Sequence, residues 1–286
     1  MAGKPSGTRG ILLDWDASVR SDVTASEWEG GVIDTIQDLL LPPCQSSQAL
    51  LDAIGRTGKT VTLGPERQPL FPDKSDANAH AEAVDPVAGT IAGGTTDHPQ
   101  NPPVPGTGAG SDSVLKFTAQ DWEPSSATAS LKAADETLFH ELVHAFRQMS
   151  GLEDSFPLDA PFEVLRRGGG TVTQLMTQTT ATRPNKHSQI YNEYEEFVAI
   201  LLTNIYRSEN KRIGLRRDHL GDAGELAYPL TNARNFLTVW RPQIERLCGE
   251  MHLLCNQLAA VECQFNPIFE LYAAQNRFLP GGRRVS

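Results

Sequence analysis

The residues with the clearest chemical potential are two histidines and a glutamate in the segment HELVH, in which His144 follows His140 by four positions. Four residues span about 400° of an α-helix, so both imidazoles project from one face, one turn apart. Two imidazole nitrogens placed in this way can bind one Zn²⁺ at about 2.0–2.1 Å. Glu141 lies beside that position, where it can take a proton from a zinc-bound water and deliver it to a leaving amine. The spacing is therefore typical of a hydrolytic zinc site.

The context of this segment supports a helix. In a chain of this composition an HExxH pattern arises by chance in roughly one case in a hundred, and a chance match need not fall on an amphipathic helix. Here the pattern lies within residues 135–150, which begin with two acidic residues, carry apolar residues at helical spacing and are followed by Gly151. The alternative interpretation is a pair of ordinary surface histidines.

A catalytic zinc site needs a third protein ligand and a position open to water. The metzincin continuation requires glycine at position 147 and histidine at position 150, where this chain has Arg147 and Ser150. That class is therefore excluded, and a carboxylate from a later helix is the natural alternative.

The helix expected over residues 191–208 offers three candidate carboxylates, on Glu193, Glu195 and Glu196. Glu196 is favoured because Ala199 follows on the same face, and a small side chain there allows close approach to the HExxH helix. This spacing resembles the ExxA pattern of gluzincin peptidases. Glu193 and Glu195 stay open as solvated carboxylates or as hydrogen-bond acceptors for a ligand histidine.

A group that stabilises the oxyanion of a tetrahedral intermediate would complete the site. A protonated His219 is the first candidate for this catalytic role, and Tyr206 and Tyr191 are further ones. The alternative for His219 is a surface or structural hydrogen-bond network with its charged neighbours. Asp135 and Glu136 are interpreted as charges at the positive end of the helix, with a ligand-orienting role as the alternative.

Charge and composition exclude other classes of protein. With 25 Lys and Arg against 35 Asp and Glu, the formal net charge of −10 repels nucleic acid and anionic lipid. No apolar run approaches the roughly twenty residues of a membrane span. Residues 1–10 are polar and basic, and no apolar segment follows, so the usual type of signal peptide is not expected. The cysteines form no CxxC pair and are expected to be reduced and buried: Cys44, Cys248, Cys255 and Cys263.

We expect an α+β fold, a mostly helical zincin-like metallopeptidase domain with a small sheet beside the HExxH helix. Residues 1–10 are predicted to be a flexible tail and 11–286 a single domain. Strands are expected over residues 10–14, 59–63 and 113–118, and helices over 32–41, 48–54, 135–150, 191–208, 232–261 with a break at Pro242, and 267–274.

Two further segments carry specific expectations. Residues 75–112 are rich in Gly and Pro and contain no aromatic residue, Lys or Arg, which predicts a long mobile loop. Residues 113–118 are expected to form a sheet edge to which an extended substrate adds as a strand. The C-terminal helices within 232–276 are expected to complete the domain.

Three segments in order, DETLFHELVHAFRQMSG, NEYEEFVAILLTNIYRSE and GLRRDH, together resemble the NleD-like effector metallopeptidases of bacterial type III secretion and related toxin domains. The resemblance implies a zinc endopeptidase with His140 and His144 as ligands and Glu141 as catalytic base. It implies virulence-related secretion without a signal peptide and action in the host cytoplasm on a protein substrate, with signalling kinases as the precedent. It leaves the third ligand, the target and the oligomeric state open.

The alternative function is a binding scaffold that keeps the metal for structure, while the helices within 232–276 dock a partner protein. Glu141 argues against this alternative, because a purely structural site has no use for a general base and usually closes the fourth coordination position with protein.

Overall fold

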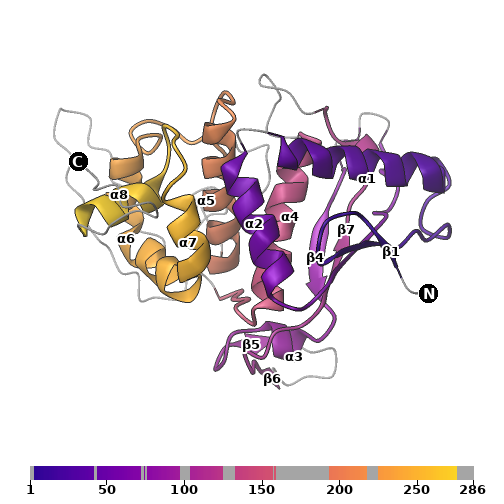
Figure 1. Ribbon diagram of the computed structural model, residues 1–286, viewed down its shortest axis with the longest axis horizontal. Helices are drawn as coiled ribbons and strands as arrows, with labels where there is room; N and C mark the ends of the chain where they lie inside the picture. Colours follow the sequence, from indigo (N-terminus) through magenta and orange to yellow (C-terminus); the bar gives the residue numbers. More distant parts are fainter. Residues whose placement is uncertain are drawn as a thin grey trace.

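The computed structural model describes residues 3–41, 44–71, 74, 76–96, 104–124, 133–156, 158, 193–217 and 225–275. In this part of the chain the fold is α+β, as predicted, with a sheet at one end and a helical assembly at the other (Figure 1). The helices are α1 (Ala25–Leu40), α2 (Gln45–Arg56), α3 (Pro86–Gly89), α4 (Ala134–Met149), α5 (Tyr194–Glu209), α6 (Ala233–Glu250), α7 (His252–Leu258) and α8 (Pro267–Ala274), with a 3₁₀ turn at Ala119–Asp121.

The larger sheet is mixed and has the strand order β1-β2-β3-β7-β4. Its three inner strands are parallel, and the two edge strands run antiparallel to their neighbours. The strands are β1 (Lys4–Pro5), β2 (Ile11–Leu13), β3 (Val61–Gly64), β7 (Ser113–Lys116) and β4 (His80–Ala83); β5 (Thr95–Thr96) and β6 (Val104–Pro105) form a separate hairpin. Alternate residues of the inner strands, such as Leu13, Leu63 and Leu115, are buried in the core.

The prediction that residues 113–118 form an exposed sheet edge was wrong. β7 covers most of this segment and pairs with β3 on one side and β4 on the other, so its backbone groups are already used within the sheet. The edge next to β7 is β4, whose four residues show no clear alternation of buried and exposed side chains.

The described part of residues 75–112 is also more regular than the expected loop. It contains β4, α3 and the β5–β6 hairpin, and backbone bonds tie it to the end of α4: the Ser111 N–H donates to the Gln148 carbonyl and the Ile91 N–H to the Glu153 carbonyl. This segment has few large apolar side chains to bury, and backbone hydrogen bonds with the rest of the protein order it instead. The predicted tail 1–10 likewise contains β1, which pairs with β2.

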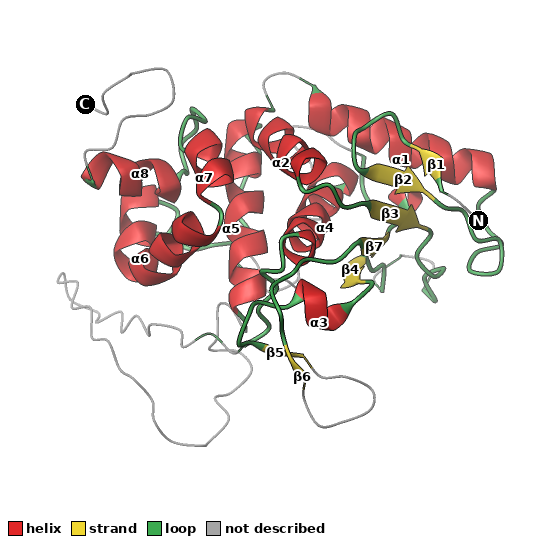
Figure 2. Cartoon of the chain, turned by 60° about the horizontal axis from the view of Figure 1, so that its bottom comes forward, coloured by secondary structure: helices red, strands yellow, loops and turns green. Residues whose placement is uncertain are grey.

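The two predicted central helices, α4 and α5, are both present and pack against each other in an antiparallel arrangement. Figure 2 shows α4 between the sheet and α5. Nearly every residue of both helices is buried, including charged ones. A helix that is buried all round must find partners for its polar side chains inside the protein.

The C-terminal helices lie on the other side of α5 from α4 (Figure 2). The predicted helical region 232–261 is present, but it is divided at Met251 into α6 and α7, and this second break was not predicted. Trp240 breaks the helical backbone of α6 just before Pro242, as predicted, and α8 begins at Pro267 with Asn266 as its cap. One continuous apolar cluster runs from the sheet to these helices, so the described residues share a single core. The four cysteines are free thiols, and three of them are buried. No described helix has the length and apolar character needed to cross a membrane.

Gly151 ends α4 in a way that no other residue can reproduce. It has φ +65°, and the N–H groups of Gly151 and Leu152 donate to the carbonyls of Gln148 and Arg147, which is a Schellman motif. A Cβ atom on Gly151 would also overlap the backbone of Gly108. The helix end is therefore fixed both by conformation and by close approach of two chain segments.

We expect Gly151→Ala to lower the free energy of unfolding by more than about 2 kcal/mol, because strain at positive φ adds to the overlap with Gly108. Gly30→Ala is the matched control: it lies inside α1, where a Cβ would meet nothing within 4 Å, and should raise stability by about 0.5–1 kcal/mol. Urea unfolding of both variants measures this. Equal midpoints for Gly151→Ala and wild type would contradict the assignment.

Candidate metal centre

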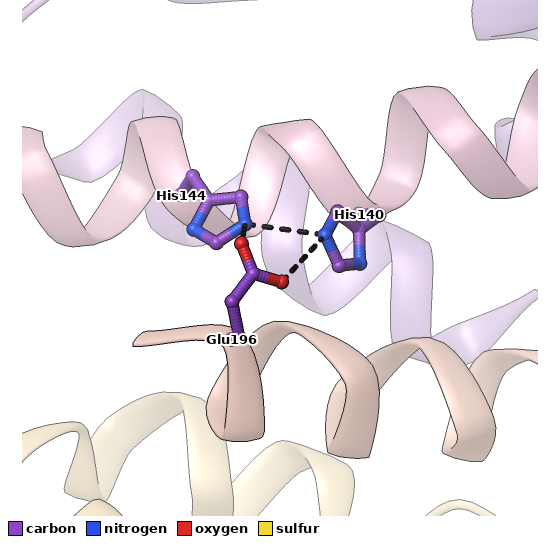
Figure 3. Close-up of side chains that lie close together, drawn as sticks. All are labelled: His140, His144 and Glu196. Atoms are coloured by element: carbon purple, nitrogen blue, oxygen red, sulfur yellow. Dashed lines mark hydrogen bonds and ion pairs between the residues drawn. The ribbon is translucent and has the colours of Figure 1, made fainter. Parts of the chain in front are cut away.

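Three side chains from α4 and α5 converge on one point. His140 and His144 project from one face of α4, and Glu196 reaches between them from the first turn of α5 (Figure 3). The two Nε2 atoms are 3.2 Å apart, and the two carboxylate oxygens of Glu196 lie 3.5 Å from the Nε2 atoms of His140 and of His144 respectively. One ligand atom from each residue lies within 4.8 Å of those of the other two.

These separations suit a tetrahedral metal ion. Donors that bind zinc at about 2.0–2.1 Å in a tetrahedral arrangement are about 3.3 Å from one another, and the observed distances are 3.2 and 3.5 Å. The donor set of two imidazoles and a carboxylate is also one that metal ions favour in proteins. The group of His140, His144 and Glu196 can therefore hold a metal ion.

The two histidines have opposite electrostatic environments. Burial is the largest influence on His140 and lowers its pKa to about 3, which keeps the imidazole neutral and able to donate a lone pair. Burial also disfavours the charged form of His144, but the carboxylates of Glu196, Glu195 and Glu141 outweigh it and raise the pKa of His144 to about 10. Without a metal, His144 therefore carries a proton at the place where a cation fits.

Glu195 holds His144 in the orientation that a metal ligand requires. Its Oε1 lies 3.2 Å from Nδ1 of His144, so that nitrogen donates the hydrogen bond and Nε2 is directed to the metal position. Its Oε2 accepts from Nε of Arg147 at 2.7 Å and from the N–H of Asp154 at 3.1 Å. Burial alone would raise the pKa of Glu195, but Arg147 and His144 outweigh it and lower that pKa, so Glu195 is ionised.

The structure thus separates the three candidate carboxylates. Glu196 lies with the histidines in the group that could hold a metal ion, Glu195 orients His144, and Glu193 is the N-cap residue of α5. Sequence reasoning favoured Glu196 and kept an orienting role among the alternatives for the other two.

Arg147 and Glu250 are supporting residues that the sequence reasoning did not find. Arg147 is completely buried and donates to Glu195, to Oε2 of Glu250 at 3.2 Å and to the carbonyl of Leu152 at 2.5 Å. Glu250, at the end of α6, also accepts from the hydroxyl of Tyr194 at 3.2 Å. The available signal was the position of Arg147, three residues after His144. Its carboxylate acceptors, however, lie 48 residues away at Glu195 and 103 residues away at Glu250.

Glu141, the predicted general base, is buried beside the histidines. Only 4% of it is exposed, and its charge is one of those that raise the pKa of His144. It therefore lies close enough to the metal position to act electrostatically on a ligand.

Of the three candidates for oxyanion stabilisation, the structure describes only Tyr206. His219 and Tyr191 lie outside the described residues. Tyr206 is described, and its hydroxyl donates to Asp135 while its ring stacks on Phe139 at 4.7 Å. Ten helical residues, about 15 Å along the axis, separate Tyr206 from Glu196, so Tyr206 does not belong to the metal centre.

Asp135 and Glu136 lie in the first turn of α4, as predicted, but they also form ion pairs that the sequence did not predict. Both are buried, Glu136 completely, and both form ion pairs with arginines that follow the metal-binding end of α5. Asp135 pairs with Arg212, and Glu136 pairs with Arg207 and Arg212. Their described ion-pair partners are therefore tertiary.

Comparisons with protein-family models, with curated proteins and with solved structures found no match to this chain. The description of the centre therefore rests on its own geometry.

We expect Glu195→Gln to lower the affinity for zinc by about 10–100-fold, because loss of an outer-shell carboxylate frees the ring of His144 and weakens its basicity. Glu193→Gln, at the N-cap position two residues earlier, should leave the affinity unchanged. Competition with a chromophoric chelator measures both constants. If Glu195→Gln binds zinc as tightly as wild type does, Glu195 does not orient His144 for metal binding.

Metal binding should also depend on pH in a direction set by His144. With its pKa near 10 in the metal-free protein, His144 must release a proton for each ion bound. The apparent association constant should therefore rise about tenfold per pH unit as pH increases from 6 to 8.5. A histidine of ordinary pKa, about 6.5, would instead give a plateau above pH 7. Chelator competition at a series of pH values distinguishes the two profiles.

Proposed function

We propose that this protein is a zinc-dependent endopeptidase that hydrolyses peptide bonds of a protein substrate. The observation that carries the proposal is the convergence of His140, His144 and Glu196 at tetrahedral spacing, with a buried Glu141 next to His140 on the same helix. Zinc is the metal of choice because two imidazoles and one carboxylate, with room for a fourth ligand, are a typical catalytic zinc set.

The residues divide the chemistry between them. A zinc ion held by His140, His144 and Glu196 would lower the pKa of a water molecule towards neutrality and would polarise the substrate carbonyl. Glu141 accepts the proton of the attacking water and returns it to the leaving amine nitrogen as the C–N bond breaks. Glu195 and Arg147 keep His144 oriented throughout. His219 remains the first candidate to stabilise the oxyanion.

The choice of a protein substrate rests on the HExxH pattern and on the resemblance to NleD-like effectors. By the same resemblance we extend the proposal to a secreted virulence factor or toxin that acts in the cytoplasm of a host cell, with signalling kinases as the model for its target. The competing function is a scaffold with a structural metal, and the following experiment separates the two.

We expect Glu141→Gln to lower the rate of casein hydrolysis by about 10²–10⁴-fold while zinc content stays near one per chain, because the variant loses the base and keeps the ligands. His144→Ala and Glu196→Ala should lose the metal and the activity together. Elemental analysis of the purified chains and electrophoresis of casein digests give both readouts. Stoichiometric zinc in a wild-type protein that cleaves no unstructured protein would favour the scaffold.

A further inference from the structure

The first turn of α5 contains Glu195 and Glu196, and the chain that follows α4 lies against this turn. The first N–H groups of a helix have no partner within the helix and must find one elsewhere. Here the N–H of Tyr194 donates to the carbonyl of Phe156 at 3.3 Å. The N–H of Glu195 donates to the carbonyl of Asp154 at 3.1 Å, and the N–H of Asp154 donates in return to Oε2 of Glu195, also at 3.1 Å. The segment after α4 therefore determines where α5 begins.

This segment, residues 154–156, belongs to no helix or strand and is held by a side chain of α6. Asp154 is buried; its Oδ1 accepts from the N–H of Phe156 at 3.1 Å, and its Oδ2 accepts from Nη2 of Arg246. A buried carboxylate is costly unless a counter-charge and hydrogen bonds replace its hydration. Arg246 supplies this counter-charge to Asp154 from a position 92 residues further along the chain.

Arg246 also contacts the first residue of α5. Its guanidinium carbon lies 3.8 Å from the centroid of the Tyr194 ring, which is a cation–π contact. Its Nε donates to Oε1 of Glu250 at 2.6 Å, and the hydroxyl of Tyr194 donates to Oε2 of Glu250 at 3.2 Å. Arg246 therefore holds Tyr194 directly through the ring and indirectly through the hydroxyl.

The same contacts continue to the metal centre. Oε2 of Glu250 also accepts from Nη1 of Arg147 at 3.2 Å. Nε of Arg147 donates to Glu195 at 2.7 Å, and the other carboxylate oxygen of Glu195 orients the ring of His144. A continuous series of hydrogen bonds therefore runs from Arg246 to His144.

The position of Glu196 depends on how firmly this first turn is held. Glu196 is only the third residue of α5, and helix ends fray. Its two carboxylate oxygens lie 3.5 Å from the Nε2 atoms of His140 and His144 respectively. Metal–ligand distances hold to within about 0.2 Å, so a small displacement of this turn would spoil the tetrahedral spacing.

We propose that Arg246 is a positioning residue of the metal centre, which holds the first turn of α5 and with it the carboxylate of Glu196. This inference rests on the zinc site of the proposed function. Arg246 acts through Asp154, Tyr194 and Glu250, which it contacts directly. Because 39% of its side chain is exposed, water can fill the space that a shorter side chain leaves, and substitution tests the contacts rather than the core.

The first test measures zinc affinity and needs no turnover. Arg246→Gln removes the charge that pairs with Asp154 and should lower the affinity by about tenfold, the lower end of the loss typical of residues that orient ligands. Arg246→Lys keeps the charge and should recover part of this loss. The matched control is Arg241→Gln, because Arg241 forms the same type of i,i+4 ion pair on α6, with Glu245, and is 45% exposed. This control should bind zinc as tightly as wild type in chelator competition.

The second test separates positioning from general stability. Co²⁺ is bound in place of zinc, and its visible absorption bands report the geometry of its ligands. Arg246→Gln should change these bands, whereas a role in stability alone would lower the melting temperature and leave the spectrum as in wild type. Asp154→Asn should change the bands in the same direction. The double variant should lose no more zinc affinity than the weaker-binding single variant, because both changes break one interaction.

Failure of the positioning role and failure of the proposed function give different results. Wild-type zinc affinity together with a wild-type Co²⁺ spectrum in Arg246→Gln would overturn the positioning role and keep the peptidase. A chain that shows the expected losses in Arg246→Gln, but cleaves no unstructured protein as wild type, would refute the peptidase and keep the positioning role. A wild-type chain that binds neither ion would refute both.

Discussion

The antiparallel register of α4 and α5 is the constraint on which the metal centre depends. Each step of one residue along a helix rotates the side chain by about 100°, so a slip of α5 by one position would carry Glu196 away from the histidines. Two buried ion pairs fix this register at opposite ends of the helix pair. Glu136 bonds Arg207 at one end, and Arg147 bonds Glu195 at the other. The ligand carboxylate lies between these two fixed points.

The same buried ion pairs explain how such charged helices can lie inside the protein. Removing a charged group from water is costly unless a partner and hydrogen bonds replace the lost hydration. Arg147 meets this requirement with two carboxylates and a carbonyl, one of the carboxylates being supplied by Glu250 of α6. The C-terminal helices therefore contribute to the metal centre electrostatically, although none of their described residues is among its ligands.

The sequence predicted what local periodicity determines and missed what depends on distant partners. The two helices, the pair His140 and His144, and Glu196 as the favoured carboxylate all follow from spacing along one or two helices. The carboxylate partners of Arg147 could not be deduced, because Glu195 lies on α5 and Glu250 on α6. Ordinary rules assign Glu136 to a solvated helix end. β4 was missed for a similar reason, since its order comes from pairing with β7 rather than from its own apolar pattern.

The exposure of the three ligands bears on whether the centre is structural or catalytic. Side-chain exposure is 2% at His140, 10% at His144 and 22% at Glu196, so the carboxylate from α5 is the most accessible of the three groups. A structural zinc site is closed by four protein ligands, whereas the described residues bring three together. Glu141 adds a buried carboxylate beside the histidines, which a purely structural ion does not require. Under the proposed function, a water in the fourth position between the metal ion and Glu141 would supply the nucleophile.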